Sequence, residues 1–139
     1  MKGNGRTPMS KPSDHVSLRE EQKRKTRAHK RGRWAEHLTA LSLLLTGHRI
    51  LARNYRTKIG EVDIIAKRGN IVIFVEVKAR TDLSTAADAI SIHQRRRIQR
   101  TAEHFLNQYP AFQVCDIRFD ACLVTGFLRI HHLRDAWGP

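Results

Sequence analysis

The sequence from Gly60 to Arg80 reads GEVDIIAKRGNIVIFVEVKAR, and it predicts one β-hairpin. Two runs rich in Val and Ile flank the dipeptide Gly69-Asn70, which tolerates positive φ and favours a two-residue hairpin loop. The run from Ile71 to Val75 is continuously apolar, which is typical of a strand that is buried on both faces. Both strands are therefore expected to be buried rather than half-solvated.

Three acids and a lysine lie within these strands at positions that the hairpin register brings together. A two-residue loop places Asp63 directly opposite Glu76 and Glu61 directly opposite Lys78. Strand alternation puts Lys78 on the same face as Glu76, while Val77 points the other way. The four ionisable side chains are thus expected on one face of the hairpin.

Directly opposed carboxylates destabilise a sheet unless something compensates their charge. Mg²⁺ often takes only one or two protein carboxylates and keeps water and substrate phosphate as its other ligands. Asp63 and Glu76 therefore predict a site for Mg²⁺ or Mn²⁺, where the Lys78 ammonium could polarise the attacking water or stabilise charge at phosphorus. The alternative is a solvated polar face with exposed ion pairs of small energetic value. The buried character of the strands favours the metal site, because buried charges are costly unless paired or metal-bound.

The arrangement of Asp63 followed by Glu76-Val77-Lys78 resembles the PD-(D/E)XK nuclease signature, in which an Asp and an acid-X-Lys lie on adjacent strands. More closely, the chain resembles the bacterial YraN family, also called UPF0102, from about Gly32 to about Trp137. The segments that carry this resemblance are Gly32-Arg33-Trp34-Ala35-Glu36, Asn54-Tyr55-Arg56, Gly60-Glu61-Val62-Asp63-Ile64-Ile65 and Phe74-Val75-Glu76-Val77-Lys78-Ala79-Arg80. The family is regarded as similar in fold to archaeal Holliday-junction resolvases, and its members are largely uncharacterised biochemically.

The resemblance implies a role for each matching position. Asp63, Glu76 and Glu36 are implied as metal ligands, together with the Val77 carbonyl, and Lys78 as the catalytic lysine. A weaker candidate for the site is Gln94, which lies on the following helix where related nucleases often carry a Lys or Gln, and where family members commonly have Lys. Ala79 replaces the Thr expected after the lysine, which removes a hydroxyl that could contact phosphate.

The composition is that of a polyanion binder. The chain has 139 residues, enough for one domain, and its 26 Lys plus Arg against 13 Asp plus Glu give a net charge of +13. This charge predicts nucleic acid as the partner, with DNA favoured over RNA, although charge alone also fits an anionic membrane or a basic ribosome-associated protein. No secretory signal or membrane-spanning segment is predicted, and the cysteines, Cys115 and Cys122, are interpreted as buried thiols on opposite sides of one strand. A cytoplasmic location is expected.

Two regions are predicted along the chain. Residues 1–31 form a basic, largely disordered arm. Residues 1–18 are predicted to be a disordered leader. The basic run at residues 19–33 is either a helical extension or a segment that wraps nucleic acid. The other interpretation of this arm is a solubilising tail. Residues 32–139 form the nuclease-like domain.

Within the domain, the order of expected elements is helix, three strands, helix and two strands. The first helix follows Gly32, has an apolar stripe and ends at Gly47; the second begins near Ser91 and ends at about Gln108. The stripe consists of Trp34, Ala35, Leu38, Leu41, Leu44 and Leu45, and that of the second helix of Ile92, Ile98, Ala102, Phe105 and Leu106. Strands are expected at 50–55, 114–125 and 127–132, besides the hairpin, and a loop at 81–89. His131 and His132 are interpreted as surface residues.

Arginines on the second helix suit phosphate contacts, since a guanidinium matches phosphate oxygens bidentately. The candidates for nucleic-acid binding are Arg33, Arg80, Arg95, Arg96, Arg97 and Arg100. Their other interpretation is an exposed basic face.

The leading hypothesis is a Mg²⁺- or Mn²⁺-dependent endonuclease for DNA, with branched or otherwise structured DNA as one expected substrate. The alternative is a non-catalytic nucleic-acid-binding protein on the same scaffold, acting with a partner, and an RNA-directed nuclease would use the same residues. A homodimer is expected only by analogy with junction resolvases, which need two sites for two opposed nicks.

Overall fold

The computed structural model describes Gly3 and residues 12–81 and 90–138. The chain divides into two compact units, Met1–Arg31 and Gly32–Pro139. The helices are α1 (Pro12–Leu45), α2 (Ile92–Gln108) and the short 3₁₀ helix η2 (Pro110–Phe112). The strands are β1 (Arg49–Arg56), β2 (Glu61–Arg68), β3 (Ile71–Arg80), β4 (Asp116–Thr125) and β5 (Arg129–Trp137).

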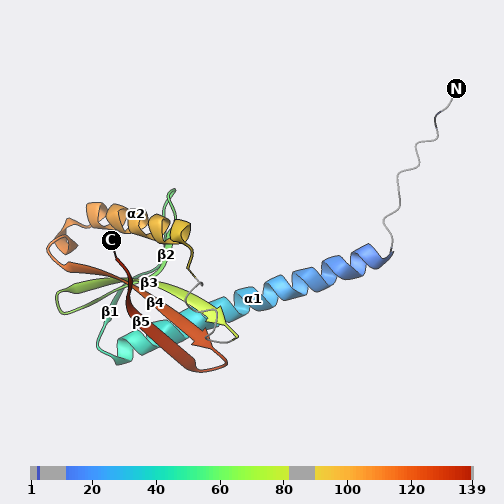
Figure 1. Cartoon of the computed structure of the whole chain (residues 1–139), viewed down its shortest axis with the longest axis horizontal. Helices are drawn as coiled ribbons and strands as arrows, with labels where there is room; N and C mark the ends of the chain where they lie inside the picture. The colour runs from blue at the N-terminus through green and yellow to red at the C-terminus, as the bar shows by residue number, and fades with distance from the viewer. Residues whose placement is uncertain (1–2, 4–11, 82–89, 139) are drawn as a thin grey trace. The chain divides into compact units, whose positions relative to one another are not determined.

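The five strands form one mixed sheet in the order β1-β2-β3-β4-β5 (Figure 1). Neighbouring strands are antiparallel except β3 and β4, which are parallel. A parallel pair needs a crossover connection, and α2 lies in it. The predicted α/β class with a mixed central sheet flanked by helices is confirmed.

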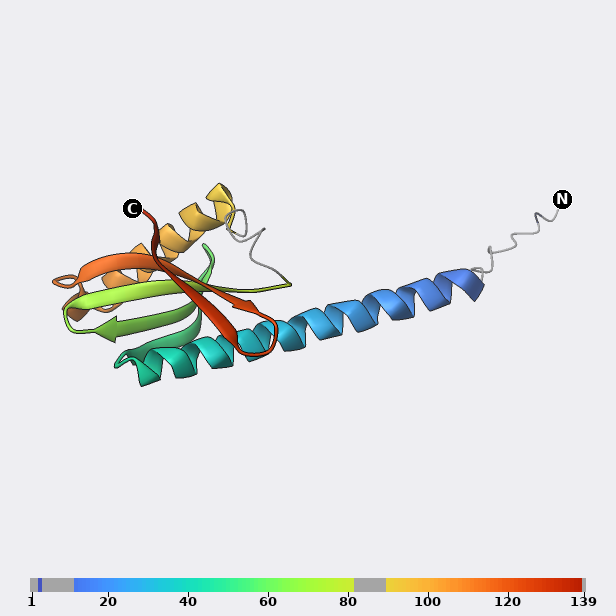
Figure 2. The ribbon, with the colours of Figure 1, turned by 60° about the horizontal axis from the view of Figure 1, so that its bottom comes forward.

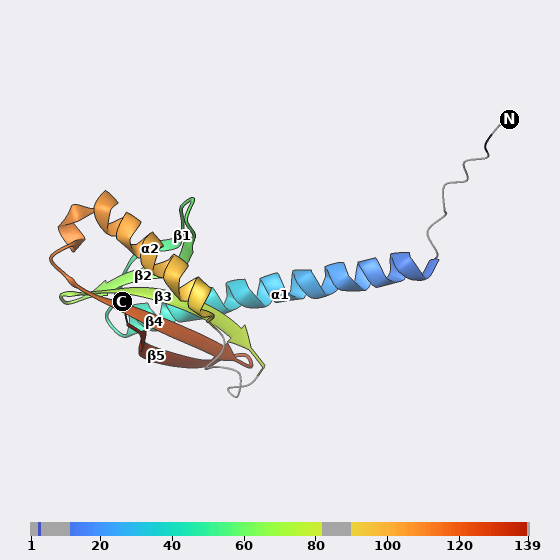
Figure 3. The same ribbon diagram turned by 45° about the horizontal axis from the view of Figure 1, so that its top comes forward.

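The two faces of the sheet carry separate apolar clusters. On one face Phe74, Phe119 and Trp137 pack with Ile98 and Phe105 of α2, and Figure 3 shows α2 crossing this face. On the other face Ala35 and Leu43 of α1 pack against strand residues that include Ile64 and Val75. Figure 2 shows the end of α1 beside the sheet, next to β1. The inner strands are therefore covered on both sides, as their apolar runs predicted.

The predicted hairpin register is confirmed from Arg68↔Ile71 to Ile64↔Val75. Gly69 has φ of 59°, as the two-residue loop requires. The backbone ladder ends at Ile64↔Val75. The predicted pairing of Asp63 with Glu76 is therefore not part of the ladder. Glu61 instead pairs with Arg56 of β1.

The first helix is longer than predicted. It begins at Pro12, so residues 12–18, expected in a disordered leader, are helical, and the rest of that leader apart from Gly3 lies outside the described residues. Proline fits the first turn of a helix, and the Glu, Gln, Lys and Arg that follow have good helix propensity. The predicted end is confirmed, because Gly47 has φ of 86° and the His48 N–H donates to the Leu43 carbonyl at 2.9 Å.

The predicted apolar stripe of this helix is confirmed only in part. Of its members, Ala35 is buried and Leu38 packs against the same cluster, whereas Leu41, Leu44 and Leu45 are exposed, and Leu43, outside the stripe, is buried. Two apolar faces overlap in this segment, and the small side chains at 35, 39 and 40 allow the closer approach to the sheet. The packed face thus combines the small side chains of Ala35, Thr39 and Ala40 with the larger Leu43.

The remaining predicted elements differ at their ends. The cap of α2 is confirmed, because Ser91 Oγ accepts from the Gln94 N–H at 3.1 Å, but Ile92 is exposed. β4 begins two residues later than expected, and β5 starts after a turn and continues to Trp137. The loop expected at 81–89 lies outside the described residues except for Thr81.

Three interpretations of single side chains are corrected or refined. His131 and His132 are half-buried rather than on the surface, since they bond to Thr125 and Asp120. The cysteines are free thiols packed on opposite sides of the sheet as predicted, although Cys115 is only half-buried. Over the described residues, no helix is long and apolar enough to cross a membrane.

Candidate functional site

The regular alternation of β2 is interrupted at Asp63. Val62 and Ile65 both belong to the cluster beneath α2, while Ile64 belongs to the cluster beneath α1. Asn54, the β1 residue that would face Asp63, has φ of 49° and is missing from the ladder. The Asp63 Oδ2 accepts the backbone N–H of Val77 at 2.8 Å. A side chain therefore replaces a main-chain partner between β2 and β3.

Glu76 lies on the α2 side of β3 and is held by two side chains. Its Oε1 accepts from Gln94 Nε2 at 2.7 Å and lies 3.3 Å from Lys78 Nζ. Gln94 comes from the first turn of α2, which the Ser91 cap fixes over the sheet. The structure thus joins three sequence-predicted site residues, Glu76, Lys78 and Gln94, by direct contacts.

Both carboxylates are buried, with 8% of Asp63 and 6% of Glu76 exposed. Burial raises the pKa of Asp63, against the Val77 N–H that lowers it, and the charges of Glu36 and Glu61 raise it further. Burial also raises the pKa of Glu76, the nearby Asp63 raises it more, and Lys78 only partly offsets this. The pair therefore carries more negative charge, when ionised, than its protein partners neutralise.

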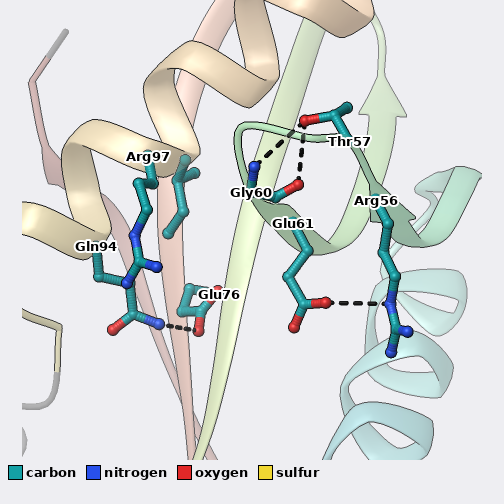
Figure 4. A pocket seen from close by; sticks show the side chains of 8 residues that line it. Arg56, Thr57, Gly60, Glu61, Glu76, Gln94 and Arg97 are labelled. Atoms are coloured by element: carbon teal, nitrogen blue, oxygen red, sulfur yellow. Dashed lines mark hydrogen bonds and ion pairs between the residues drawn. The ribbon is translucent and has the colours of Figure 1, made fainter.

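Glu76 lines a cavity of about 320 Å³ (Figure 4). Its lining consists of Arg56, Thr57, Gly60, Glu61, Glu76, Gln94, Arg97 and Ile98. In Figure 4, Glu76 points toward Gln94, and Glu61 points toward Arg56. The Arg56 Nε lies 3.1 Å from Glu61 Oε2. The cavity thus joins the acids of the hairpin to arginines from β1 and α2.

One wall of this cavity is the turn between β1 and β2. Thr57 closes the turn, because its N–H donates to the Gly60 carbonyl at 2.8 Å and its Oγ1 accepts the Gly60 N–H at 3.3 Å. A Cβ on Gly60 would lie 3.1 Å from Thr101 Oγ1 and 3.4 Å from Arg97 Cβ. Glycine at this position therefore lets the turn approach α2 closely.

The predicted arginines do not act as one group. Arg97 lines the cavity, whereas Arg95 lies over the Trp137 ring at 6.0 Å from its centroid. The Arg80 Nη1 donates to the Ala79 carbonyl at 2.9 Å. The other candidates, Arg33, Arg96 and Arg100, are exposed.

Glu36 is half-buried on α1, on the other face of the sheet from α2. Its charge raises the pKa of Asp63. Across the described residues, no three His, Cys, Asp or Glu side chains are grouped closely enough to hold a metal ion. The candidate metal site therefore rests on the two buried carboxylates, Asp63 and Glu76.

This donor set fits a hard cation that keeps water ligands. Mg²⁺ needs only one or two carboxylates, whereas a catalytic Zn²⁺ takes three protein ligands. The N–H and C=O of one strand residue point toward the same neighbouring strand, and the Val77 N–H points toward Asp63 of β2, so the Val77 carbonyl is expected to point toward β2. Two carboxylates with raised pKa values and a carbonyl provide oxygen ligands only, as Mg²⁺ and Mn²⁺ prefer.

Sequence reasoning missed Arg56, Thr57 and Gly60 as residues of the cavity. Arg56 and Gly60 belong to segments that carried the family resemblance, yet spacing gave them no chemical role. The β1–β2 register brings Arg56 opposite Glu61, and a hairpin of β1 with β2 would have indicated this pair. The contact of Gly60 with α2 joins residues that are far apart in the chain, and it had no sequence signal.

Comparison with known proteins identifies similar chains. The model of a family described as "Uncharacterised protein family UPF0102" matches residues 35–124. A UPF0102 protein of Parvibaculum lavamentivorans is 43% identical over 112 residues, covering 81% of this chain and 84% of that protein. A UPF0102 protein of Rhizobium meliloti is 44% identical over 114 residues, covering 82% of this chain and 93% of that protein.

Proposed function

The chain belongs to the uncharacterised protein family UPF0102, and we propose that it is a Mg²⁺- or Mn²⁺-dependent endonuclease that hydrolyses phosphodiester bonds in DNA. The observation that carries this proposal is the buried pair Asp63 and Glu76 beside Lys78, on adjacent strands of the sheet. A structural ion-pair network would neutralise these acids, but Lys78 is the only cation among the described residues that forms an ion pair with either of them. A divalent cation would supply the positive charge that Lys78 alone does not provide to the two carboxylates.

Asp63, Glu76 and the Val77 carbonyl would hold the ion, with Glu36 as a further ligand that could act through water. When bound, the ion supplies a Lewis acid for the phosphoryl oxygen and lowers the pKa of a bound water. Asp63 is positioned by the Val77 N–H, and Glu76 by the Gln94 amide. These hydrogen bonds fix both carboxylates in place before substrate binds.

Lys78 has 22% of its side chain exposed and reaches the same oxygen of Glu76 that Gln94 contacts. Its ammonium would orient the attacking water or stabilise charge at phosphorus in the transition state. Arg97 and Arg56 line the adjoining cavity and would contact phosphates that flank the scissile bond. The lysine and the arginines thus have separate roles, in chemistry and in binding.

DNA is favoured as substrate by the net charge of +13. The compact unit Gly32–Pro139 has about the size of one domain. We therefore propose that DNA shape, as in branched or structured DNA, or a partner protein directs the activity. A cytoplasmic location and a homodimer are part of the same proposal, the latter because paired nicks need two sites.

The test compares wild type with Glu76→Gln and Lys78→Ala on labelled duplex, single-stranded, flap and four-way-junction DNA. Each reaction is run with Mg²⁺, with Mn²⁺ and with EDTA. Wild type is expected to cleave only with metal, and both variants should lose at least about a hundredfold of the rate. Glu103→Gln, an exposed acid on α2, is the matched control and should cleave like wild type.

Calorimetric titration of Mn²⁺ provides a second measurement that does not require the right substrate. Wild type and Glu103→Gln are expected to bind the ion, and Asp63→Asn and Glu76→Gln to lose this binding. Cleavage by Glu76→Gln at the wild-type rate would refute the assignment. The other outcome is that wild type binds DNA without cleaving it and that Asp63→Asn causes no loss of Mn²⁺ binding. This would favour a non-catalytic binding protein instead.

A further inference from the structure

A second cavity, of about 170 Å³, lies on the α1 side of the sheet. Four basic side chains and two apolar ones line it: His48, Arg68, Ile71, Ile73, Arg118 and Arg134. The basic residues come from different places in the chain, namely the connection between α1 and β1, and the strands β2, β4 and β5. Glu76 and Gln94 lie on the opposite face, so this cavity is separate from the candidate metal site.

No acid is among the residues that line this second cavity. Cations that converge in a partly dehydrated space repel one another, and an anion relieves that cost. The pKa of His48 shows the effect: burial lowers it first, and the charges of Arg68, His132 and Arg118 lower it further. Asp120 offsets the charge of Arg118, but among the described residues no acid forms an ion pair with Arg68 or Arg134, so the lining keeps a net positive charge.

Two of the arginines have structural partners but keep donors to spare. Arg118 uses its Nε and Nη2 to contact Asp120 at 2.8 and 2.9 Å. Arg68 uses its Nη1 to donate to the Thr46 carbonyl at 3.2 Å. A guanidinium has five N–H donors, so each retains several for another acceptor.

Arg134 and His48 complete the lining. Arg134 makes no hydrogen bond or ion pair with any residue that the structure describes. The His48 Nδ1 lies 3.1 Å from the Thr46 hydroxyl oxygen and 3.2 Å from the Leu43 carbonyl oxygen, and it donates to that carbonyl in the tautomer in which Nδ1 carries the proton. Nε2 is then the ring nitrogen that can gain a second proton when an anion is near.

We propose that this second cavity binds a phosphate-type oxyanion, held by Arg68, Arg118 and Arg134 with His48 beneath it. The planar guanidinium forks suit the oxygens of a tetrahedral anion. Ile71 and Ile73 provide an apolar floor that leaves the anion's oxygens to the arginines. The anion is either free phosphate or a phosphodiester of a nucleic acid, and in the second case DNA touches the protein on the face opposite the candidate metal site.

The test uses the full chain without divalent metal, so its outcome does not depend on nuclease activity. Phosphate is titrated at constant ionic strength, balanced with chloride, and binding is followed by calorimetry and by the ring nitrogen signals of His48. Arg134→Met is compared with Arg129→Met, which removes the same charge from the same strand but lies outside the cavity. Arg134→Met is expected to weaken binding about tenfold or more, and Arg129→Met less than about twofold.

A second arm repeats the comparison with a short DNA duplex under the same conditions. A tenfold loss with both probes would assign the cavity to backbone phosphates of DNA. A loss with phosphate alone would support the oxyanion site and assign it to a small free anion. Equal affinities of the two variants for both probes, with His48 signals that do not move, would overturn the proposal.

Discussion

Three buried acids of this protein differ in how far their charge is matched. Asp120 is completely buried, yet Arg118, His132 and the Asp135 N–H all donate to it. Asp63 and Glu76 are nearly as buried but have fewer cationic partners. The matched acid stabilises the fold, whereas the unmatched pair is where a functional cation is expected.

The first prediction concerns the charge of Asp63. In the absence of metal, Asp63→Asn should melt at the wild-type temperature or a few degrees above it, because the amide oxygen still accepts the Val77 N–H while repulsion with Glu76 disappears. Mn²⁺ should raise the melting temperature of wild type but not of this variant. Differential scanning calorimetry with and without MnCl₂ measures both, and Asp116→Asn, an exposed acid, should behave like wild type. A variant that Mn²⁺ still stabilises as strongly would contradict the prediction.

The second prediction concerns the stability provided by Asp120. Burial tends to raise its pKa, but the hydrogen bonds from His132, Arg118 and the Asp135 N–H outweigh burial and lower the pKa to about 2. An aspartate in an unfolded chain has a pKa of about 3.9. The stabilisation is therefore complete above that pH and is lost as the pH falls toward 2. Urea denaturation of wild type should show this loss within that window.

Asp120→Asn should cost about 3–5 kcal/mol near neutral pH, because it leaves Arg118 and His132 without an anion. The difference from wild type should shrink as the pH falls from about 4 to about 2. His132→Gln keeps a donor near Asp120 and gives a milder variant for the same titration. A difference that stays constant over this range would show that the Asp120 charge is not the source of stability.

At the scale of elements, α2 makes one close contact with the β1–β2 turn. Gly60 faces Thr101, whose hydroxyl is fixed by donating to the Arg97 carbonyl at 2.7 Å. The same turn and the same helix form two walls of the cavity beside Glu76. Packing between these elements and the shape of the candidate site are therefore coupled.

The third prediction follows from this contact. Gly60→Ala should destabilise the protein by about 1–3 kcal/mol, since its methyl group would crowd a hydroxyl that cannot easily move. Thr101→Ala in the same chain should restore most of the loss, because the crowded atom is gone. Denaturant titrations of the two single variants and the double variant measure this coupling. Additive losses in the double variant would place the cause elsewhere than in this contact.

At the scale of the whole molecule, the net charge of +13 is concentrated partly in the arm, residues 12–31 of α1. Four of its cations, Arg19, Lys23, Arg27 and Lys30, lie on one side of the helix and line a shallow groove along it. The family match begins at residue 35, so this arm lies outside it. We expect the arm to contribute phosphate contacts to DNA binding.

The fourth prediction gives this contribution a magnitude. Each neutralised phosphate adds about 0.9 to the slope of log affinity against log salt concentration. Replacing these four cations of the arm with Gln should therefore reduce the slope for duplex DNA by about 3 to 4. Fluorescence anisotropy over a range of salt concentrations measures the slope.

A control variant lowers the net charge equally by removing four exposed cations from the unit Gly32–Pro139. These are Arg49, Arg53, Lys58 and Arg129. Its slope should fall by less, if the arm rather than total charge makes the contacts. Equal slopes for the two variants would assign the binding to net charge. Equal slopes for the arm variant and wild type would identify the arm as a solubilising tail.

The sequence by itself determined the hairpin, its register up to Ile64↔Val75, the cap of α2 and the burial of the inner strands. These features are local: a Gly-Asn loop fixes which residues pair, and continuous apolar runs require cover on both faces. It also indicated the pair Asp63 and Glu76, because burying two acids within strands costs free energy unless their charges are paired or bound to a metal.

The tertiary structure decided which apolar residues of α1 meet the sheet, because Leu43 packs there while Leu41, Leu44 and Leu45 stay exposed. It also interrupted the ladder between β2 and β3 at Asp63, where the Asp63 carboxylate accepts the Val77 N–H in place of the expected backbone pairing. It also brought together the cavity beside Gly60 and the four basic residues of the second cavity. Contacts between residues distant in the chain depend on how elements pack, and a single sequence carries no local signal for them.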